Sequence, residues 1–264
     1  LDQPVGNAAI NSVPRQTIIQ AVKEACSFQG YEGGIRVIIS VPEGEMIAEK
    51  TFNPRLGIVG GISIIGTSGI VEPMSQEALV ETIRTEMKMR LANGSAVILA
   101  VPGNYGEDFS QTICSVPAEQ IVKCSNFIGE TIDSAVEFGA EGLLFISNIG
   151  KFVKVAGGIM NTHSRNADSR MEILTAHAAL AGADNDTLVK IMGCVMTEDA
   201  LDVLNEKNLL QPVMKSITEK INFYLNNRSK GQITTGAIIF SSNHGMLGET
   251  ENAGELLKIL EDGP

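Results

Sequence analysis

The chain has 264 residues, 44% of them hydrophobic, and a formal net charge of −11. This length allows one large domain or two modest ones, each with its own core. The excess of acidic residues argues against nucleic acid or an anionic membrane surface as the main partner. Gly, Pro or charge interrupts every apolar run before it is long enough to span a bilayer.

The cysteines point to a reducing compartment. Cys26, Cys114, Cys124 and Cys194 are widely scattered, form no C-x-x-C pair and lie among apolar neighbours. Such a setting is typical of buried, reduced thiols. No secretory signal is visible, so we expect a cytoplasmic protein without disulfides. The spacing of the cysteines and histidines matches no metal site that we recognise, so we expect no metal.

The first predicted elements are a helix, a strand and a short helix. The first helix begins at Ser12 and has apolar residues at helical spacing. The alternating run GGIRVIISVPEG predicts a strand at residues 35–41. The run EGEMIAEKTF predicts a short helix that ends before Asn53-Pro54. We expect residues 1–54 to be the remnant of a smaller α+β domain.

Residues 57–75 read GIVGGISIIGTSGIVEPMS, a glycine-rich run without charge until Glu72. A buried strand gains nothing from glycine, whereas a loop whose backbone approaches a ligand does. The P-loop spacing from Gly61 to Gly66 lacks its lysine, because Thr67 stands there, so we reject an NTPase. The dinucleotide fingerprint also fails. The residues alone leave open whether this turn binds a ligand at a helix opening or is only a crowded structural turn.

From Ser75 onward, helical patterns alternate with short, uninterrupted apolar strands. The strands are predicted at residues 96–101, 142–147 and 236–240. This alternation indicates a parallel sheet with helices on both faces. We therefore expect residues 55–264 to form a Rossmann-like α/β domain with a mostly parallel sheet.

The segments that follow these three strands are small and polar. They read VPGNYGEDF, SNIGKF and SSNHGM, and they carry Asn104, Asn148 and Asn243. Ligands of open parallel sheets bind outside the carboxyl ends of the strands. One such segment is typical of an ordinary turn, but three at the same edge favour a ligand cleft.

The run NIGKFVKVAGGIMNTHSRNADSRMEI is the most polar part of this pattern. It gathers the basic residues Lys151, Lys154, His163, Arg165 and Arg170. In an acidic protein, such a cluster favours a carboxylate or phosphate site. The alternative is a solvated loop in which Asn166 or Asp168 caps the next helix. A hydrolase triad is unsupported, because no G-x-S-x-G elbow is present.

Four runs of the sequence resemble the CbiD family: VGNAAINSVPR, TFNPRLGIVGGISIIGTSGIVEPMS, VPGNYGEDF and GKFVKVAGGIMNTHSRNADSRMEIL. They follow in order over nearly the whole chain. The resemblance implies a cobalt-precorrin-5B C1-methyltransferase of anaerobic cobalamin biosynthesis, with S-adenosylmethionine as methyl donor. Family members usually carry a further amino-terminal segment with a Thr-Gly-Thr-Cys-Ala-like start, which this sequence lacks. Ser12 stands where the family has proline.

The implied reaction fits the residues. Cobalt-precorrins carry acetate and propionate groups, and methyl transfer needs alignment and exclusion of water more than a nucleophile. We expect the methyl donor to contact Gly61, Gly66, Thr67, Gly69, Gly103 and Asn104. We expect the acceptor to contact Lys151, Lys154, Asn161, Arg165 and His244. His163 is the expected catalytic residue, as a proton-transfer group.

An alternative from a different class is a non-catalytic tetrapyrrole-binding or channelling protein. It would bind the macrocycle and retain it without turnover. The sequence leaves open which groups touch the donor, whether a general base exists and whether the chain forms a homo-oligomer.

Overall fold

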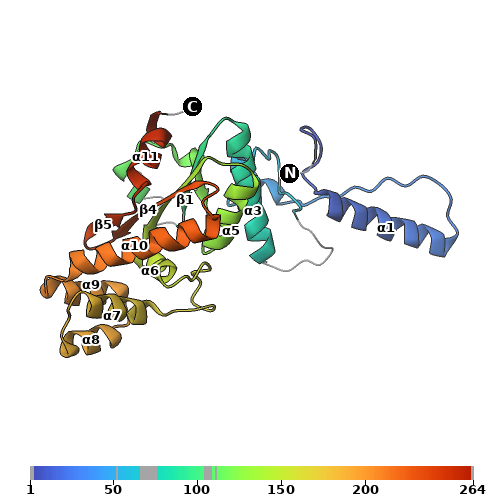
Figure 1. Ribbon diagram of the computed structural model, residues 1–264. Coiled ribbons are helices and arrows are strands. Elements are labelled where there is room, and N and C mark those ends of the chain that lie inside the picture. The colour runs from blue at the N-terminus through green and yellow to red at the C-terminus, as the bar shows by residue number, and fades with distance from the viewer. Residues whose placement is uncertain (1–2, 52, 66–75, 104–108, 111, 263–264) are drawn as a thin grey trace. The chain divides into compact units, whose positions relative to one another are not determined.

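The computed structural model describes residues 3–51, 53–65, 76–103, 109–110 and 112–262 (Figure 1). The chain divides into two compact units, Leu1–Met89 and Arg90–Pro264. The predicted boundary between residues 54 and 55 falls inside the first unit. None of the described helices has the length and apolar character that a membrane span requires.

Helices and irregular segments make up the described part of the first unit. The helices are α1 (Ser12–Gln29), α2 (Gly44–Ala48), the 3₁₀ turn η1 (Asn53–Leu56) and α3 (Gln76–Ala92), which ends just beyond the unit. α1 ends at Gly30, whose φ of 61° is left-handed and whose N–H donates to the carbonyl of Ser27. This is a common way to end a helix, because glycine adopts that conformation without strain.

The strand predicted at residues 35–41 is wrong. The structure has no strand there, and the apolar side chains of the stretch are exposed, Ile38 to 74%. Alternating hydrophobicity fixes which side chains would share a face, but a strand forms only where a second backbone takes up its N–H and C=O groups. No described segment pairs with residues 35–41; Ile10 and Ile64 form an isolated parallel bridge instead.

The second unit is built on a sheet with the strand order β2-β1-β3-β4-β5 among its described residues. The strands are β1 (Val97–Val101), β2 (Ile121–Lys123, after the 3₁₀ turn η2, Ala118–Gln120), β3 (Gly142–Asn148), β4 (Thr234–Ser241) and β5 (Gly245–Glu249). β1 to β4 are parallel, and β5 returns antiparallel to β4. The predicted α/β class and the three predicted strands are confirmed. β2 and β5 were not predicted.

Helices cover both faces of this sheet, as predicted (Figure 1). On one face lie α5 (Ile128–Glu137), α6 (Ile149–Ala156) and α10 (Leu210–Ser229). The other face is covered by α11 (Ala253–Asp262). A further group of helices, α7 (Arg170–Leu180), α8 (Asn185–Met192) and α9 (Thr197–Glu206), packs beside α6 and α10.

Two glycines let α11 lie directly on the sheet. A Cβ on Gly236 in β4 would be 2.9 Å from Leu256 Cδ1 and 3.1 Å from Ala253 Cα. A Cβ on Gly142 in β3 would be 2.5 Å from the other methyl group of Leu256. Leu256 is buried against both strands, and this contact closes the core on that face.

Candidate functional site

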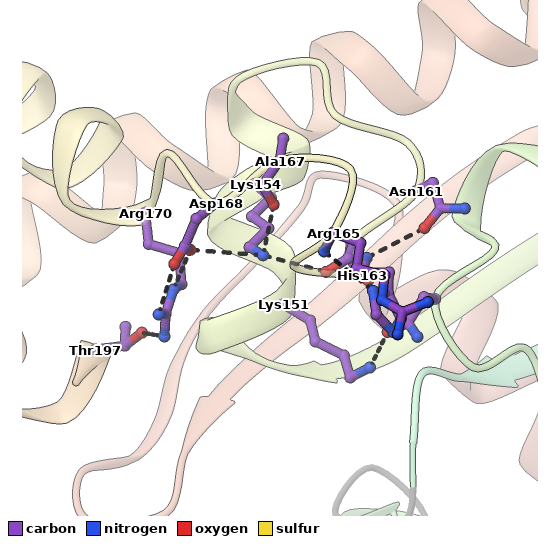
Figure 2. Close-up of polar contacts among 11 residues, drawn as sticks. Lys151, Lys154, Asn161, His163, Arg165, Ala167, Asp168, Arg170 and Thr197 are labelled. Carbon is purple, nitrogen blue, oxygen red and sulfur yellow. Dashed lines mark hydrogen bonds and ion pairs between the residues drawn. The ribbon is translucent and has the colours of Figure 1, made fainter. Parts of the chain in front are cut away.

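The carboxyl ends of β1, β2 and β3 meet at one edge of the sheet, since the three strands are parallel. α6 begins at this edge, where Asn148 Oδ1 accepts a hydrogen bond of 2.9 Å from the Gly150 N–H. A pocket of about 350 Å³ opens beside α6. It is lined by Asn126, Gly150, Lys151, Lys154, Thr162, His163, Ser164 and Arg170. Figure 2 shows the polar contacts around it.

Lys151 lies across the ends of β1 and β2. Its Nζ donates to Asn126 Oδ1, and its Cε is 3.4 Å from the position of a Cβ on Gly103. Burial lowers the pKa of Lys151 from its ordinary value, and the nearby charge of Lys154 lowers it further. Burial also raises the pKa of Cys124 to about 12, so this thiol stays protonated at neutral pH.

Lys154 lies one turn later on α6 and is almost fully buried, with 4% of its side chain exposed. Its Nζ donates to the carbonyl oxygens of Thr162 (3.2 Å) and Ala167 (2.9 Å). It also lies 3.6 Å from Asp168 Oδ1. The ammonium group is therefore bound to the segment 157–169, which we call the pocket loop.

Asp168 joins the pocket loop to α7. Two nitrogens of Arg170 donate to its two carboxylate oxygens, at 2.5 and 3.0 Å. These hydrogen bonds hold the pKa of Asp168 below its usual range and raise the pKa of Arg170. A third nitrogen of Arg170 donates to Thr197 Oγ1 of α9 at 3.3 Å. Arg170 is thus held by protein groups on two sides (Figure 2).

His163 lies at the exposed rim of the pocket, and its backbone is held by Asn161, whose Oδ1 accepts from the His163 N–H at 3.1 Å. The imidazole Nδ1 accepts a hydrogen bond of 3.1 Å from the Arg165 backbone N–H. With Nδ1 as acceptor, a neutral ring carries its hydrogen on Nε2. His163 therefore offers a hydrogen-bond donor.

The structure brings only some of the predicted acceptor residues to the pocket. Lys151, Lys154 and His163 line it, whereas Asn161 and Arg165 contact His163 through the bonds above. His244 is not among the lining residues. It lies in the turn between β4 and β5, where its Nε2 is 2.9 Å from Asp202 Oδ1.

The third predicted strand exit is a tight turn that leads straight into β5. Ser241 Oγ donates to Glu198 at 2.5 Å, and the Ser242 N–H donates to the same carboxylate at 3.2 Å. The turn is therefore fixed to the amino end of α9. Small polar residues favour turns as well as clefts, and here they serve the turn.

Of the predicted donor residues, Gly103 lies at the end of β1 with a φ of 86°, beside Lys151. Gly61 belongs to the first unit, where it lines a separate cavity of about 840 Å³ together with other glycines and Glu45. Gly66, Thr67, Gly69 and Asn104 lie outside the described residues. Within the described residues, no group of three His, Cys, Asp or Glu side chains is placed to hold a metal ion.

Asn126 is a pocket residue that the sequence pattern does not predict. Its backbone carbonyl accepts from the Thr162 N–H at 2.9 Å, and its side chain accepts from Lys151. It follows β2, a strand of three residues and too short to give a clear apolar pattern. The run Cys124-Ser125-Asn126 is nevertheless small and polar, like the exits that were recognised.

Comparisons with known proteins identify the family of the chain. The CbiD family model matches residues 1–73, and the model of the CbiD C-terminal domain matches residues 161–251. A cobalt-precorrin-5B C(1)-methyltransferase from Alkaliphilus metalliredigens is 43% identical over 261 residues, which are 99% of this chain and 68% of that protein. The chain belongs to the CbiD family. The resemblance seen in the sequence is thereby confirmed.

Other curated relatives of this CbiD chain carry the same name. The protein from Ruminiclostridium cellulolyticum is 50% identical over 237 residues, 90% of the chain and 62% of that relative. The protein from Clostridioides difficile is 40% identical over 268 residues, 98% of the chain and 65% of that relative. The chain thus spans about two thirds of the length of these relatives. No solved structure matches it.

Proposed function

We propose that this chain carries out, or forms a large part of a protein that carries out, S-adenosylmethionine-dependent C1-methylation of cobalt-precorrin-5B. The names of its relatives support the reaction. The single structural observation that supports it is the basic pocket at the carboxyl edge of the sheet, whose Lys151 ammonium donates, within the described part of the chain, to Asn126 alone. The mostly parallel sheet supports our proposal that this unit is a Rossmann-like domain. We also propose a cytoplasmic location.

The acceptor is a macrocycle with several carboxylates, and the pocket offers donors that suit them. Lys151 has hydrogens left after its bond to Asn126. The Nε2–H of His163 lies at the rim, and the exposed Arg165 follows on the same loop. Charge-assisted bonds of this kind are the strong ones, and Arg adds bidentate geometry. These groups would hold the periphery of the macrocycle while its ring carbon meets the methyl donor.

In the proposed reaction, an electron pair of the ring carbon forms a bond to the donor's methyl carbon, and the methyl–sulfur bond breaks. The neutral thioether S-adenosylhomocysteine leaves, and the methylated ring then gives up a proton. A cationic sulfonium with an adenosine fits a glycine-lined cavity with a carboxylate, which is how Gly61 and Glu45 are combined in the first unit. The predicted donor contacts at Gly66, Thr67, Gly69, Gly103 and Asn104 remain part of the proposal.

The proposed part of His163 in proton transfer meets a geometric condition. Its Nε2 already carries the hydrogen in the neutral ring, so a proton would have to enter at Nδ1. That requires the Arg165 N–H to leave Nδ1. The arrangement described above favours His163 as a donor to an acceptor carboxylate, and the ring nitrogens of the macrocycle as the proton acceptor.

Methyl transfer can be measured directly. This chain and a version extended to the full length of its relatives are incubated anaerobically with cobalt-precorrin-5B and methyl-labelled S-adenosylmethionine. We expect label in the macrocycle, and loss of that label when Lys151 is replaced by Met. Tight retention of the macrocycle without any transfer by either protein would overturn the proposal and favour a tetrapyrrole-binding protein.

A further inference from the structure

Two lysines one turn apart on α6 have different surroundings, although the sequence gives them the same appearance. Lys151 is half-buried and donates to the side chain of Asn126. Lys154 is buried and donates to two backbone carbonyls of the pocket loop, with a carboxylate close by. An ammonium group has three hydrogens; two of those of Lys154 are bonded to carbonyls, and Asp168 Oδ1 lies 3.6 Å away as its ion-pair partner.

The contacts of Lys154 span the pocket loop. Thr162 lies on one side of His163, and Ala167 and Asp168 lie on the other. Both sides of the segment that carries His163 are therefore tied to a single side chain of α6 (Figure 2). Asp168 in turn holds Arg170, which bonds to Thr197 of α9.

A buried ammonium is costly unless its hydrogens are bonded. Lys154 meets most of that condition with protein groups, two carbonyl oxygens and a nearby carboxylate, and only 4% of its side chain is exposed. Removing the ammonium would leave two carbonyl oxygens of the loop without this donor, which is more damaging than the loss of a solvated contact. Among the described residues, the hydrogen bond of Lys151 goes to Asn126, which lies outside the pocket loop.

We propose that Lys154 is a positioning residue that holds the pocket loop, and with it His163, while Lys151 is the lysine that meets the ligand. The assignment of Lys151 rests on the proposed function. The assignment of Lys154 concerns the protein without any ligand and is independent of that function.

Amide hydrogen exchange of the full chain tests the positioning role. The reporters are the amides of Arg165, Asn166 and Ala167, which donate to His163 within the loop. We expect Lys154→Met to speed their exchange about tenfold or more, because loss of the Lys154 contacts with the pocket loop favours local opening. The matched variant Lys151→Met should leave them within about twofold of the parent. Exchange in α10 and β3 should be unchanged in both.

A second variant guards against simple unfolding. Asp168→Asn weakens the ion pair with Lys154 by a change at an exposed side chain. The exchange rate of the loop amides in this variant should lie between that of the parent and that of Lys154→Met. Parent-like exchange in the loop of both Lys154→Met and Asp168→Asn would overturn the positioning role.

The ligand contact is tested with uroporphyrin, a fluorescent tetrapyrrole that carries acetate and propionate groups, bound at several salt concentrations. A direct charge contact makes affinity fall with salt. Lys151→Met should weaken binding and flatten this salt dependence. Lys154→Met should also weaken binding but should leave the salt dependence unchanged. Flattening in Lys154→Met alone would reverse the two assignments. A parent that binds no uroporphyrin would overturn the proposed function and the part of Lys151, while the exchange data still decide the part of Lys154.

Discussion

The side chain of Lys151 lies against Gly103 at the end of β1, at van der Waals distance from the position that a Cβ would take. A Cβ on Gly103 would lie 3.4 Å from Lys151 Cε and 3.9 Å from its Nζ. Gly103 also has a φ of 86°, which other residues adopt only with strain. The end of β1 thus packs against the side chain of Lys151.

Replacing Gly103 by Ala should therefore weaken the fold. We expect a loss of roughly 1–3 kcal/mol of unfolding free energy from the backbone strain, measured by urea denaturation. Uroporphyrin affinity should stay close to that of the parent, because the added Cβ would meet Lys151 only at van der Waals distance. Gly139→Ala is the matched control, since Gly139 has a φ of 74° and nothing within 4 Å of the added Cβ. A clearly lower affinity in Gly103→Ala than in Gly139→Ala would contradict this account and show that Lys151 had been displaced.

Lys151→Met should reduce binding without reducing stability. Burial lowers the pKa of Lys151, which means that its charged form is poorly solvated in the folded protein. Met keeps most of the side-chain length and removes that cost, so the unfolding free energy should stay within about 1 kcal/mol of the parent or rise. Uroporphyrin affinity should fall roughly 10- to 100-fold, as for a charge-assisted bond. Lys190→Met, at an exposed lysine of α8, is the control and should alter neither property.

His163→Gln separates a hydrogen-bond donor from a base. The Gln amide can donate where Nε2–H does but cannot take up a proton, so we expect single-turnover methyl transfer within a few-fold of the parent. His163→Leu removes the donor as well and should weaken acceptor binding. A rate roughly 10²–10⁴-fold lower in His163→Gln, with unchanged affinity, would instead establish the proton-transfer role and require Nδ1 to release Arg165.

His177 should make the fold sensitive to mild acid. Burial lowers its pKa, the charge of Lys220 lowers it further, and its Nδ1 lies 2.7 Å from Ser216 Oγ. The unfolded chain takes up a proton near pH 6.5, but the folded chain does so only at lower pH. The unfolding free energy should therefore fall as pH drops below about 6.5, until the folded protein is protonated as well. Denaturation of His177→Gln between pH 8 and 5 should show a shallower decline; an identical decline would contradict this account.

Gly236→Ala should loosen α11. The added Cβ would lie 3.1 Å from Ala253 Cα and 3.2 Å from its backbone nitrogen, and a helix backbone cannot yield as a side chain does. Overpacking of this kind costs roughly 1–3 kcal/mol, which calorimetry would record as a lower Tm. Gly254→Ala is the control, because nothing lies within 4 Å of its added Cβ and it is in a helix. That variant should match the parent or exceed it in stability.

The sequence predicts the centre of the second unit well because the apolar pattern is strong there. β1, β3 and β4 are buried on both faces, so their residues form short continuous apolar runs. β2 has three residues, and β5 reads GMLGE, with two glycines in five positions. Pairing with a neighbouring strand makes these two segments strands, and no local pattern reports it.

Residue type reveals the polar cluster in the sequence, but residue type alone does not separate the roles of its members. Residue type shows that Lys151 and Lys154 can hold an anion. It does not show that Lys154 binds the carbonyls of Thr162 and Ala167, because every residue carries a carbonyl. Asn126 was missed since the chain returns to the pocket only through the pairing of β2 with β1.

The register of β3 with β4, from Gly142 beside Thr234 to Asn148 beside Phe240, affects how the protein is made. The helices α6 to α10 are synthesised between these two central strands. During translation, β3 therefore emerges long before β4, so its edge away from β1 stays unpaired, and Leu256, which covers the face shared by β3 and β4, emerges later still. Pairing over such a separation is slow, and unpaired apolar strands aggregate readily. The nascent second unit should thus need protection, as by a chaperone, until residue 256 has left the ribosome.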